Sequence, residues 1–214
     1  MLSGLFVTGT DTGVGKTIVS AALVHQFRRR GPVRYWKPVQ TGIEEDDDTA
    51  TVRRLAACRA EEIFEDGVRL PRPLSPHASA RLAGVTITID DILRRIAGQG
   101  SPPSWIVEGA GGVLVPLNDR QLMIDLMVRL ALPVVVAARS GLGTINHTLL
   151  TLEALAARGL TVAGVVMNGP LDPSNRAAIE TYGHVAVIGE LPPLDPLAAD
   201  TLSACAESFR LDRA

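Results

Sequence analysis

Short apolar runs alternate along this chain with segments in which apolar residues recur at helical spacing. The runs have the length of strands, as at residues 5–7, 33–36 and 133–138. The segment at 16–30 has helical spacing and ends at Gly31-Pro32, which stops helices. Continuous apolar runs are typical of parallel strands that are buried on both faces. The pattern therefore predicts an α/β fold with a single doubly wound, mainly parallel sheet and helices on both faces.

The remaining elements follow the same alternation. Further strands are expected near 105–107, at 161–168 and at 184–188, and further helices from about 48 to 55 and at 78–82, 88–96, 122–130, 144–157 and 196–209. The stretch at 70–77 is rich in proline and is expected to be a surface loop. Because no repeat, low-complexity tract or linker interrupts the chain, residues 1–214 are expected to form one domain.

The composition of the chain bears on whether it binds nucleic acid or membranes. Apolar residues make up 46% of the 214 residues and charged residues 21%, and the net charge is −2. This balance gives no indication of a nucleic-acid or membrane partner. Aromatic residues make up only 4%, which argues against a stacking platform for single-stranded nucleic acid.

Localisation is expected to be cytoplasmic. Met1 runs almost directly into the first strand, with no pattern of a signal segment, and no apolar run is long enough to span a bilayer. Cys58 and Cys205 are far apart and belong to no metal-ligand or redox pattern. We therefore expect both thiols to be reduced and partly buried.

The first strand leads into a loop with the pattern of a phosphate-binding site. The loop reads Gly-Thr-Asp-Thr-Gly-Val-Gly-Lys-Thr over residues 9–17, and a helix follows at once. Its glycines allow backbone N–H groups to converge on an anion at a helix N-terminus. Lys16 is then placed to reach the β- and γ-phosphates, and Thr17 to reach Mg²⁺. Five residues separate Gly9 from Gly15, one more than the strict pattern has.

Two further charged residues follow predicted strands. Lys37 ends the strand at 33–36, and Glu108 ends the strand near 105–107, where glycines follow it. The carboxyl ends of parallel strands border the ligand crevice of an open sheet. Lys37 is therefore a candidate second cation near the phosphates, although alone it would read as a surface lysine. Glu108 is a candidate acidic Mg²⁺ ligand, the alternative being a carboxylate that caps a turn.

Several polar positions leave two interpretations open. The acidic run at 44–48 is either a solvated helix start or the source of one metal ligand. Gly143 and Thr144 begin a helix and offer free N–H groups to an anion. Asn168 ends a strand, where its amide would either read a base or cap a turn. His77 and His147 are undecided between structural and ligand-contacting roles.

The motifs together resemble one family. The phosphate loop, Lys37-Pro38-Val39, the segment Glu-Gly-Ala-Gly-Gly at 108–112, Gly-Thr-Ile-Asn-His at 143–147 and Gly-Glu-Leu-Pro at 189–192 occur in this order. This set resembles dethiobiotin synthetase of biotin biosynthesis. The resemblance covers nearly the whole chain, most weakly at 59–104 and in the last helix.

The resemblance implies a set of site residues. Thr17, Asp48 and Glu108 resemble the Mg²⁺ ligands, and Lys16 and Lys37 the two catalytic lysines. The positions that resemble nucleotide contacts are Gly13, Val14, Gly15, Lys16, Thr17, Asp48, Glu108, Gly109, Ala110, Gly111, Asn168, Gly169, Pro192, Pro193 and Leu194. Those that resemble substrate contacts are Thr12, Lys37, Thr41, Gly143, Thr144 and Asn146.

The resemblance also implies partners and a reaction. The last three substrate positions are supplied by a second subunit in the family, so a homodimer is implied. The implied activity is an ATP-dependent ligase reaction with Mg²⁺, 7,8-diaminopelargonate and CO₂ or bicarbonate, which proceeds through a carbamate and a carbamic–phosphoric anhydride. In one departure, Gly13 stands where some members carry an acidic residue.

A rival interpretation is a partitioning-type switch ATPase with a deviant phosphate loop. Those proteins carry a lysine early in the loop, where this chain has Asp11, and the chain has no amphipathic membrane-targeting tail.

Overall fold

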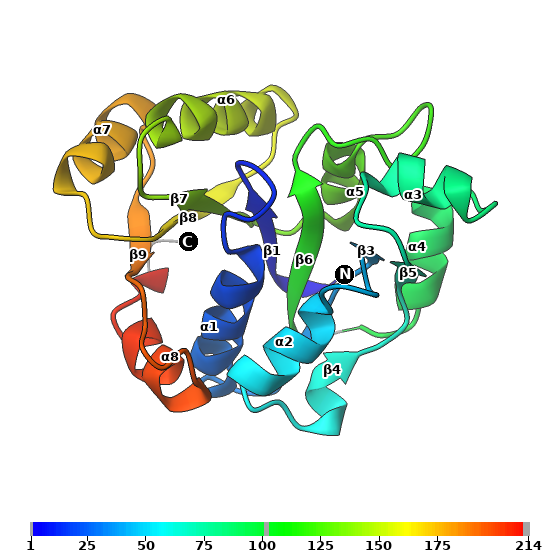
Figure 1. The fold of residues 1–214 in the computed structure, drawn as a ribbon, viewed down its shortest axis with the longest axis horizontal. Helices are drawn as coiled ribbons and strands as arrows, with labels where there is room; N and C mark the ends of the chain where they lie inside the picture. Colours follow the sequence, from blue (N-terminus) through cyan, green and yellow to red (C-terminus); the bar gives the residue numbers. More distant parts are fainter. Residues whose placement is uncertain (1, 101–102, 212–214) are drawn as a thin grey trace.

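The central sheet contains seven strands, all of them parallel. A computed structural model describes residues 2–100 and 103–211. Within this part of the chain the strand order is β4-β2-β6-β1-β7-β8-β9 (Figure 1). The strands are β1 (Ser3–Gly9), β2 (Val33–Trp36), β4 (Ile63–Phe64), β6 (Ser104–Gly112), β7 (Val134–Arg139), β8 (Val162–Asn168) and β9 (Val187–Leu191).

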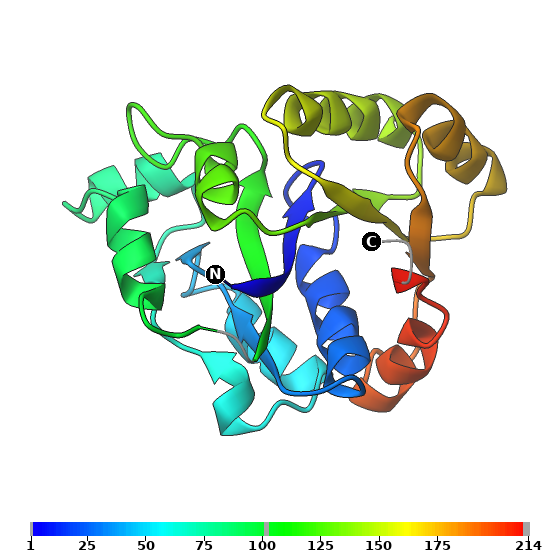
Figure 2. The ribbon, with the colours of Figure 1, turned by 180° about the vertical axis from the view of Figure 1, so that it is seen from behind.

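Helices cover both faces of this sheet. The helices are α1 (Lys16–Arg28), α2 (Asp48–Leu55), α3 (Pro76–Leu82), α4 (Ile89–Ile96), α5 (Met123–Leu130), α6 (Thr144–Ala157), α7 (Pro173–Gly183) and α8 (Ala199–Ala206), with a 3₁₀ turn at Ala60–Glu62. Helices α1, α2 and α8 share one core cluster, and α3 to α7 share the other. Views from the front and from behind both place α1, α2 and α8 together, below α6 and α7 (Figures 1 and 2). The predicted doubly wound architecture is therefore confirmed.

The two core clusters follow from the alternation of side chains along each strand. On β1, Leu5 and Val7 point towards α1, whereas Phe6 points to the opposite face. All three are almost completely buried. Successive side chains of a strand point to opposite faces, so a central strand that is covered on both sides must be apolar throughout. This is why the strands read as uninterrupted apolar runs.

A small second sheet was not predicted. Strands β3 (Val39–Thr41) and β5 (Val68–Leu70) pair in parallel beside the main sheet. Three residues per strand are too few for a periodic signal, so the sequence pattern predicted no strand at either segment. Pairing of β3 with β5 holds the chain that follows Lys37 and Pro38 against the segment that precedes the proline-rich loop.

Several predicted boundaries were wrong. The last strand lies at Val187–Leu191, because His184 ends α7 in a left-handed conformation with φ of 48°. Helix α7 itself was missed, although Asp172 caps it and Pro173 occupies its first turn. The first helix ends two residues early, at Arg28, and the last is confined to Ala199–Ala206.

The topology brings the functional candidates to one edge. Strands β1, β2, β6 and β8 all end there, and they deliver the phosphate loop, Lys37, the segment 108–112 and Asn168. No helix within the described residues is long and apolar enough to cross a membrane.

Candidate functional site

The loop between β1 and α1 has the conformation that a phosphate-binding loop requires. Gly13 and Gly15 adopt left-handed φ values of 71° and 93°. Gly15 caps α1 without a side-chain hydrogen bond, so no side chain takes up the N–H groups of the first turn. A hydrogen bond from the Thr10 N–H to the Ala137 carbonyl ties the loop to β7. The loop therefore presents a helix N-terminus that is open to an anion.

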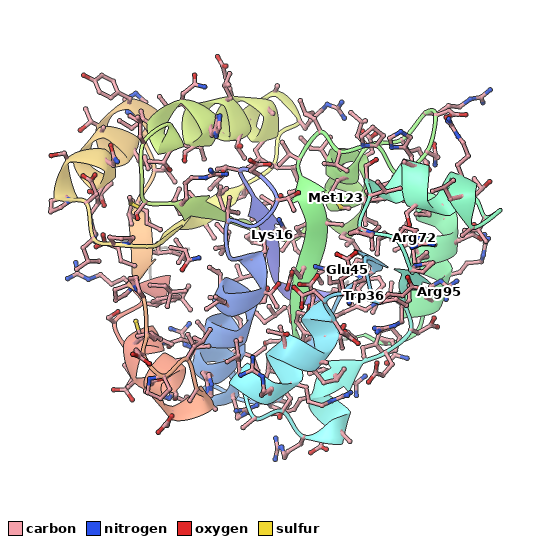
Figure 3. The ribbon with its side chains drawn as sticks, in the orientation of Figure 1. Lys16, Trp36, Glu45, Arg72, Arg95 and Met123 are labelled. Carbon is pink, nitrogen blue, oxygen red and sulfur yellow. The ribbon has the colours of Figure 1, made fainter. Side chains whose placement is uncertain are left out.

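Lys16 lies at the first position of α1, between the loop and the sheet. Figure 3 shows it near the centre of the molecule, while Arg72 and Arg95 lie towards one side. Its Nζ donates to the Asp11 carbonyl oxygen at 2.9 Å. The side chain is buried, and burial, followed by repulsion from Lys37, lowers its pKa. Lys16 is thus folded back onto its own loop and available to a phosphate.

In the first turn of α1, the Thr17 hydroxyl lies beside two carboxylates. The Thr17 Oγ1 atom lies 2.7 Å from Asp48 Oδ1 and 3.1 Å from Glu108 Oε1. Asp48 begins α2, and Glu108 stands in β6 with no exposed surface. Thr17 and two residues that lie 31 and 91 positions from it in sequence therefore form one oxygen-rich cluster.

Lys37 bridges the two carboxylates. Its Nζ lies 2.5 Å from Asp48 Oδ2 and 2.6 Å from Glu108 Oε1. Burial alone would lower the pKa of Lys37, but Glu108 and Asp48 outweigh burial and raise it. Burial alone would raise the pKa of Asp48, but Lys37 and Thr17 lower it. The site therefore favours a charged Lys37 ammonium that is paired with an ionised Asp48 and contacts Glu108.

The acidic run at 44–48 divides into two roles. Asp47 caps α2 by accepting from the Ala50 N–H at 3.1 Å, and it pairs with Arg69 at 2.6 Å. Asp48, the next residue, faces Thr17 and Lys37 instead. The structure therefore selects one carboxylate of the run for the site.

A cavity of about 730 Å³ opens beside this cluster. The predicted residues on its wall are Thr12, Gly13, Gly15, Lys16, Thr17, Lys37, Thr41, Asp48, Glu108, Ala110 and Gly111. Sequence reasoning missed the other residues of the wall, namely Ile18, Asp46, Thr51, Leu55, the segment at 73–76, Val115 and Leu197. The proline-rich pattern of the segment at 73–76 indicated a surface loop but gave no signal that it faces a site.

Of the predicted base-contacting residues, Asn168 lies next to the phosphate loop, and none of them is on this wall. The Asn168 Nδ2 donates to the Val14 carbonyl at 3.2 Å, so its amide braces the loop. The Gly169 N–H donates to the Leu191 carbonyl at 2.9 Å, which joins the end of β8 to the end of β9. Residues 192–194 continue from that point. This bond to the phosphate loop is a contact of Asn168 that the sequence did not predict.

The start of α6 stands apart from the cavity wall. Gly143, Thr144 and Asn146 do not line the cavity, and Gly143 caps α6 with φ of 90° and without a side-chain bond. His147 lines a second cavity, of about 400 Å³, together with Thr10 to Thr12 of the phosphate loop. His77 instead binds locally, its Nδ1 lying 3.1 Å from Ser75 Oγ.

The oxygen cluster fits Mg²⁺. Mg²⁺ prefers oxygen donors and is usually bound by one or two carboxylates, with phosphate and water completing the shell. The Asp48 and Glu108 carboxylates and the Thr17 hydroxyl supply that kind of donor set beside the phosphate loop. Among the described residues no group of three or more His, Cys, Asp and Glu side chains could hold a metal.

Solved structures with a similar fold include a ParA family ATPase and a MinD protein. A ParA family ATPase from Chlorobium tepidum superposes with a TM-score of 0.58 at 10% identity, covering 96% of this chain and 98% of that one. The septum site-determining protein MinD from Pyrococcus horikoshii, solved with Mg-ADP, gives 0.59 at 15% identity, with coverage of 97% and 95%. At such low identity these similarities support the fold alone.

Sequence relatives identify the family. A family model described as AAA domain matches residues 3–201. The ATP-dependent dethiobiotin synthetase BioD of Paramagnetospirillum magneticum is 50% identical over 202 residues, 94% of each chain. That of Brucella melitensis is 46% identical over 213 residues, 99% of this chain and 97% of the relative.

A longer relative carries the same segment. The biotin biosynthesis bifunctional protein BioCD of Bordetella avium is 50% identical over 93% of this chain, which spans 41% of that protein. These identities favour the synthetase over the switch ATPase. The chain belongs to the ATP-dependent dethiobiotin synthetase family, whose members are ATP-dependent ligases.

Proposed function

We propose that this protein closes the ureido ring of dethiobiotin from 7,8-diaminopelargonate, CO₂ and ATP. The observation that carries the proposal is the buried Lys37, which lies between Asp48 and Glu108 beside a phosphate loop. The names of the relatives supply the substrate class. The site offers what such a reaction needs: an anion-binding loop, two ammonium groups and a set of oxygen donors in one cavity.

ATP is the proposed co-substrate. The phosphates would lie across the N–H groups of residues 13–17, where the dipole of α1 and the Lys16 ammonium attract negative charge. Residues 108–111 and 168–169 and the turn at 192–194 are proposed to contact the rest of the nucleotide. Asn168 and Gly169 already lie against the loop or the neighbouring strand end, which supports this placement.

Mg²⁺ is the proposed metal, held by Thr17, Asp48 and Glu108. Their oxygens form one cluster at the loop, and a MinD protein of similar fold was solved with Mg-ADP. When bound, the metal would supply charge neutralisation to the phosphate oxygens.

The chemistry requires activation of a weak electrophile. An amine of the substrate adds to CO₂ and loses a proton, which gives a carbamate. A carbamate oxygen attacks the γ-phosphorus and ADP leaves, so that a carbamic–phosphoric anhydride forms. The second amine then attacks the carbonyl carbon, and inorganic phosphate departs as the ring closes.

Lys16 and Lys37 are the proposed catalytic residues. In this scheme negative charge builds up on the transferring phosphoryl oxygens and on the carbamate. Lys16 faces the phosphates from the loop, and Lys37 is the second ammonium near the same point. Donors that are already fixed in a buried site stabilise developing charge with little reorganisation.

We propose that the diamine lies in the cavity near Thr12 and Thr41, both of which line it. Its carboxylate would reach Gly143, Thr144 and Asn146 of a second subunit, which makes the enzyme a homodimer. Exposed leucines around α6 support an association surface there: Leu142 is fully exposed, and Leu150 and Leu114 are more than half exposed.

Two broader proposals accompany this one. We propose that residues 1–214 form a single domain, because the central sheet draws strands from both ends of the chain. We also propose a cytoplasmic location, in keeping with the free thiols of Cys58 and Cys205.

Phosphate release tests the proposal. Purified protein is mixed with ATP, Mg²⁺ and bicarbonate, with and without 7,8-diaminopelargonate. The proposal predicts phosphate release that depends on the diamine. Release at an equal rate without the diamine would contradict it and would favour a switch ATPase.

A further inference from the structure

Tyr35 is a buried side chain that contacts the site from behind. It lies in β2, directly opposite Ile106 of the parallel strand β6. Glu108 is two residues beyond Ile106 and therefore points to the same face of the sheet. The Tyr35 ring has no exposed surface and packs in the core cluster under α1. From this position its hydroxyl reaches Glu108 Oε2 at 2.9 Å.

The hydrogen bonds of Glu108 divide its two oxygens. Oε1 faces the site and lies near Thr17 Oγ1 and Lys37 Nζ, at 3.1 and 2.6 Å. Oε2 faces the core and accepts from Tyr35. Both oxygens of the carboxylate are therefore held by hydrogen-bonding groups, and only Oε1 faces the site.

We propose that Tyr35 is a positioning residue for metal binding: it fixes Glu108 so that the carboxylate offers the single oxygen Oε1 to the ion. The inference rests on the proposed Mg²⁺ site. Groups that hydrogen-bond to a metal ligand orient it, and their removal typically lowers metal affinity ~10- to 100-fold. A small ion with strict octahedral geometry is especially sensitive to how its carboxylate ligand is held.

The chemistry of Tyr35 suits this role. A phenol hydroxyl can donate to a carboxylate oxygen, and the Tyr35 hydroxyl donates to Glu108 Oε2 in this structure. Tyr35 takes no direct part in substrate contact, because it does not line the cavity that holds Lys37 and Thr17.

The variant Tyr35→Phe removes the donor and keeps the ring. Tyr182→Phe is the matched control, because Tyr182 is the second of the two tyrosines in the chain and is 70% exposed on α7. Glu108→Gln removes the proposed metal ligand itself. Each protein is titrated with Mn²⁺ in the presence of ADP, and bound ion is followed by electron paramagnetic resonance. ADP affinity is measured separately in EDTA, and thermal unfolding shows that each variant is folded.

The expected result for Tyr35→Phe is a roughly tenfold loss of Mn²⁺ affinity with unchanged ADP affinity in EDTA. In the Glu108→Gln background the same substitution should then have no further effect on Mn²⁺. A loss of less than threefold, an equal loss of ADP affinity in EDTA or an undiminished effect in the double variant would overturn the inference. If Glu108→Gln binds Mn²⁺ as tightly as the unaltered protein, the proposed metal site itself fails.

Discussion

Replacing Lys37 by methionine should destabilise the protein unless a divalent cation is present. The substitution keeps most of the apolar stem and removes the ammonium that lies 2.5 Å from Asp48 and 2.6 Å from Glu108. The two carboxylates, one of them fully buried, then share a site without a positive partner close to both. The perturbation is therefore one of charge rather than of packing.

The magnitude follows from the burial of the cluster. The side chains of Lys37 and Glu108 are 4% and 0% exposed, and that of Asp48 is 23% exposed. Removing one partner of a buried ion pair costs about 3–5 kcal/mol, because the remaining charge is left without compensation. Partial exposure of Asp48 and the nearby Lys16 favour the lower end, so we expect a loss of about 3 kcal/mol in the free energy of unfolding.

The pH dependence has a definite sign. The fold raises the pKa of Lys37, so its contribution is complete below the unfolded value of about 10.4 and is lost as pH rises through the folded value. The difference between the unaltered protein and Lys37→Met should therefore be full at pH 8 and should narrow only in strong alkali.

Urea unfolding at pH 8 measures the difference, first in EDTA and then with Mg²⁺. We expect Mg²⁺ to stabilise Lys37→Met more than the unaltered protein, because in the variant no ammonium competes for the carboxylates. The exposed substitution Arg120→Met is the control. A variant whose free energy of unfolding in EDTA is within 1 kcal/mol of that of the unaltered protein, or one that Mg²⁺ does not preferentially stabilise, would refute this reasoning.

Loss of the Lys37 ammonium should also slow catalysis. Lys37→Ala should lower kcat at least ~10²-fold, the scale of losing one donor to a developing charge.

Two further predictions concern the phosphate loop and its lysine. Lys16 and Lys37 are the two lysines of the chain, so isotope-labelled lysine gives two side-chain NMR signals. As pH rises, Lys16 should lose its proton before Lys37, because the fold lowers the pKa of Lys16 and raises that of Lys37. The reverse order would contradict the electrostatic account. Gly15→Ala should weaken ATP binding more than Gly13→Ala. Both glycines have left-handed φ, but a Cβ at Gly15 would lie 2.1 Å from the Asn168 amide, whereas one at Gly13 meets nothing within 4 Å. Equal ATP affinities of the two variants in a calorimetric titration would show that this contact is unimportant.

The sequence pattern predicted the strands and loops that carry the site, because each is determined by residues that are neighbours in sequence. An apolar run followed by glycines and Gly-Lys-Thr requires no knowledge of distant residues, and Lys37 and Glu108 each stand directly after such a run. What the pattern could not give is which side chains meet. Tyr35 and Glu108 are 73 positions apart, and their contact depends on the register of β2 against β6.

The short strands were not predicted for a related reason. Strands β3 and β5 have three residues each, and their pairing is fixed by the tertiary structure rather than by periodicity. The start of β9 was placed three residues early because a continuous apolar run at 185–188 follows His184, the residue that caps α7 in the structure. The role of the loop at 73–76 as cavity wall likewise depends on the folding of distant segments.

The fate of labelled bicarbonate tests the central claim most directly. Carbon-13-labelled bicarbonate is supplied with ATP, Mg²⁺ and 7,8-diaminopelargonate, and products are quantified by mass spectrometry alongside ADP. The account predicts a cyclic urea that contains the labelled carbon, formed in equal amount to ADP. ADP formed without any labelled ring product would contradict it.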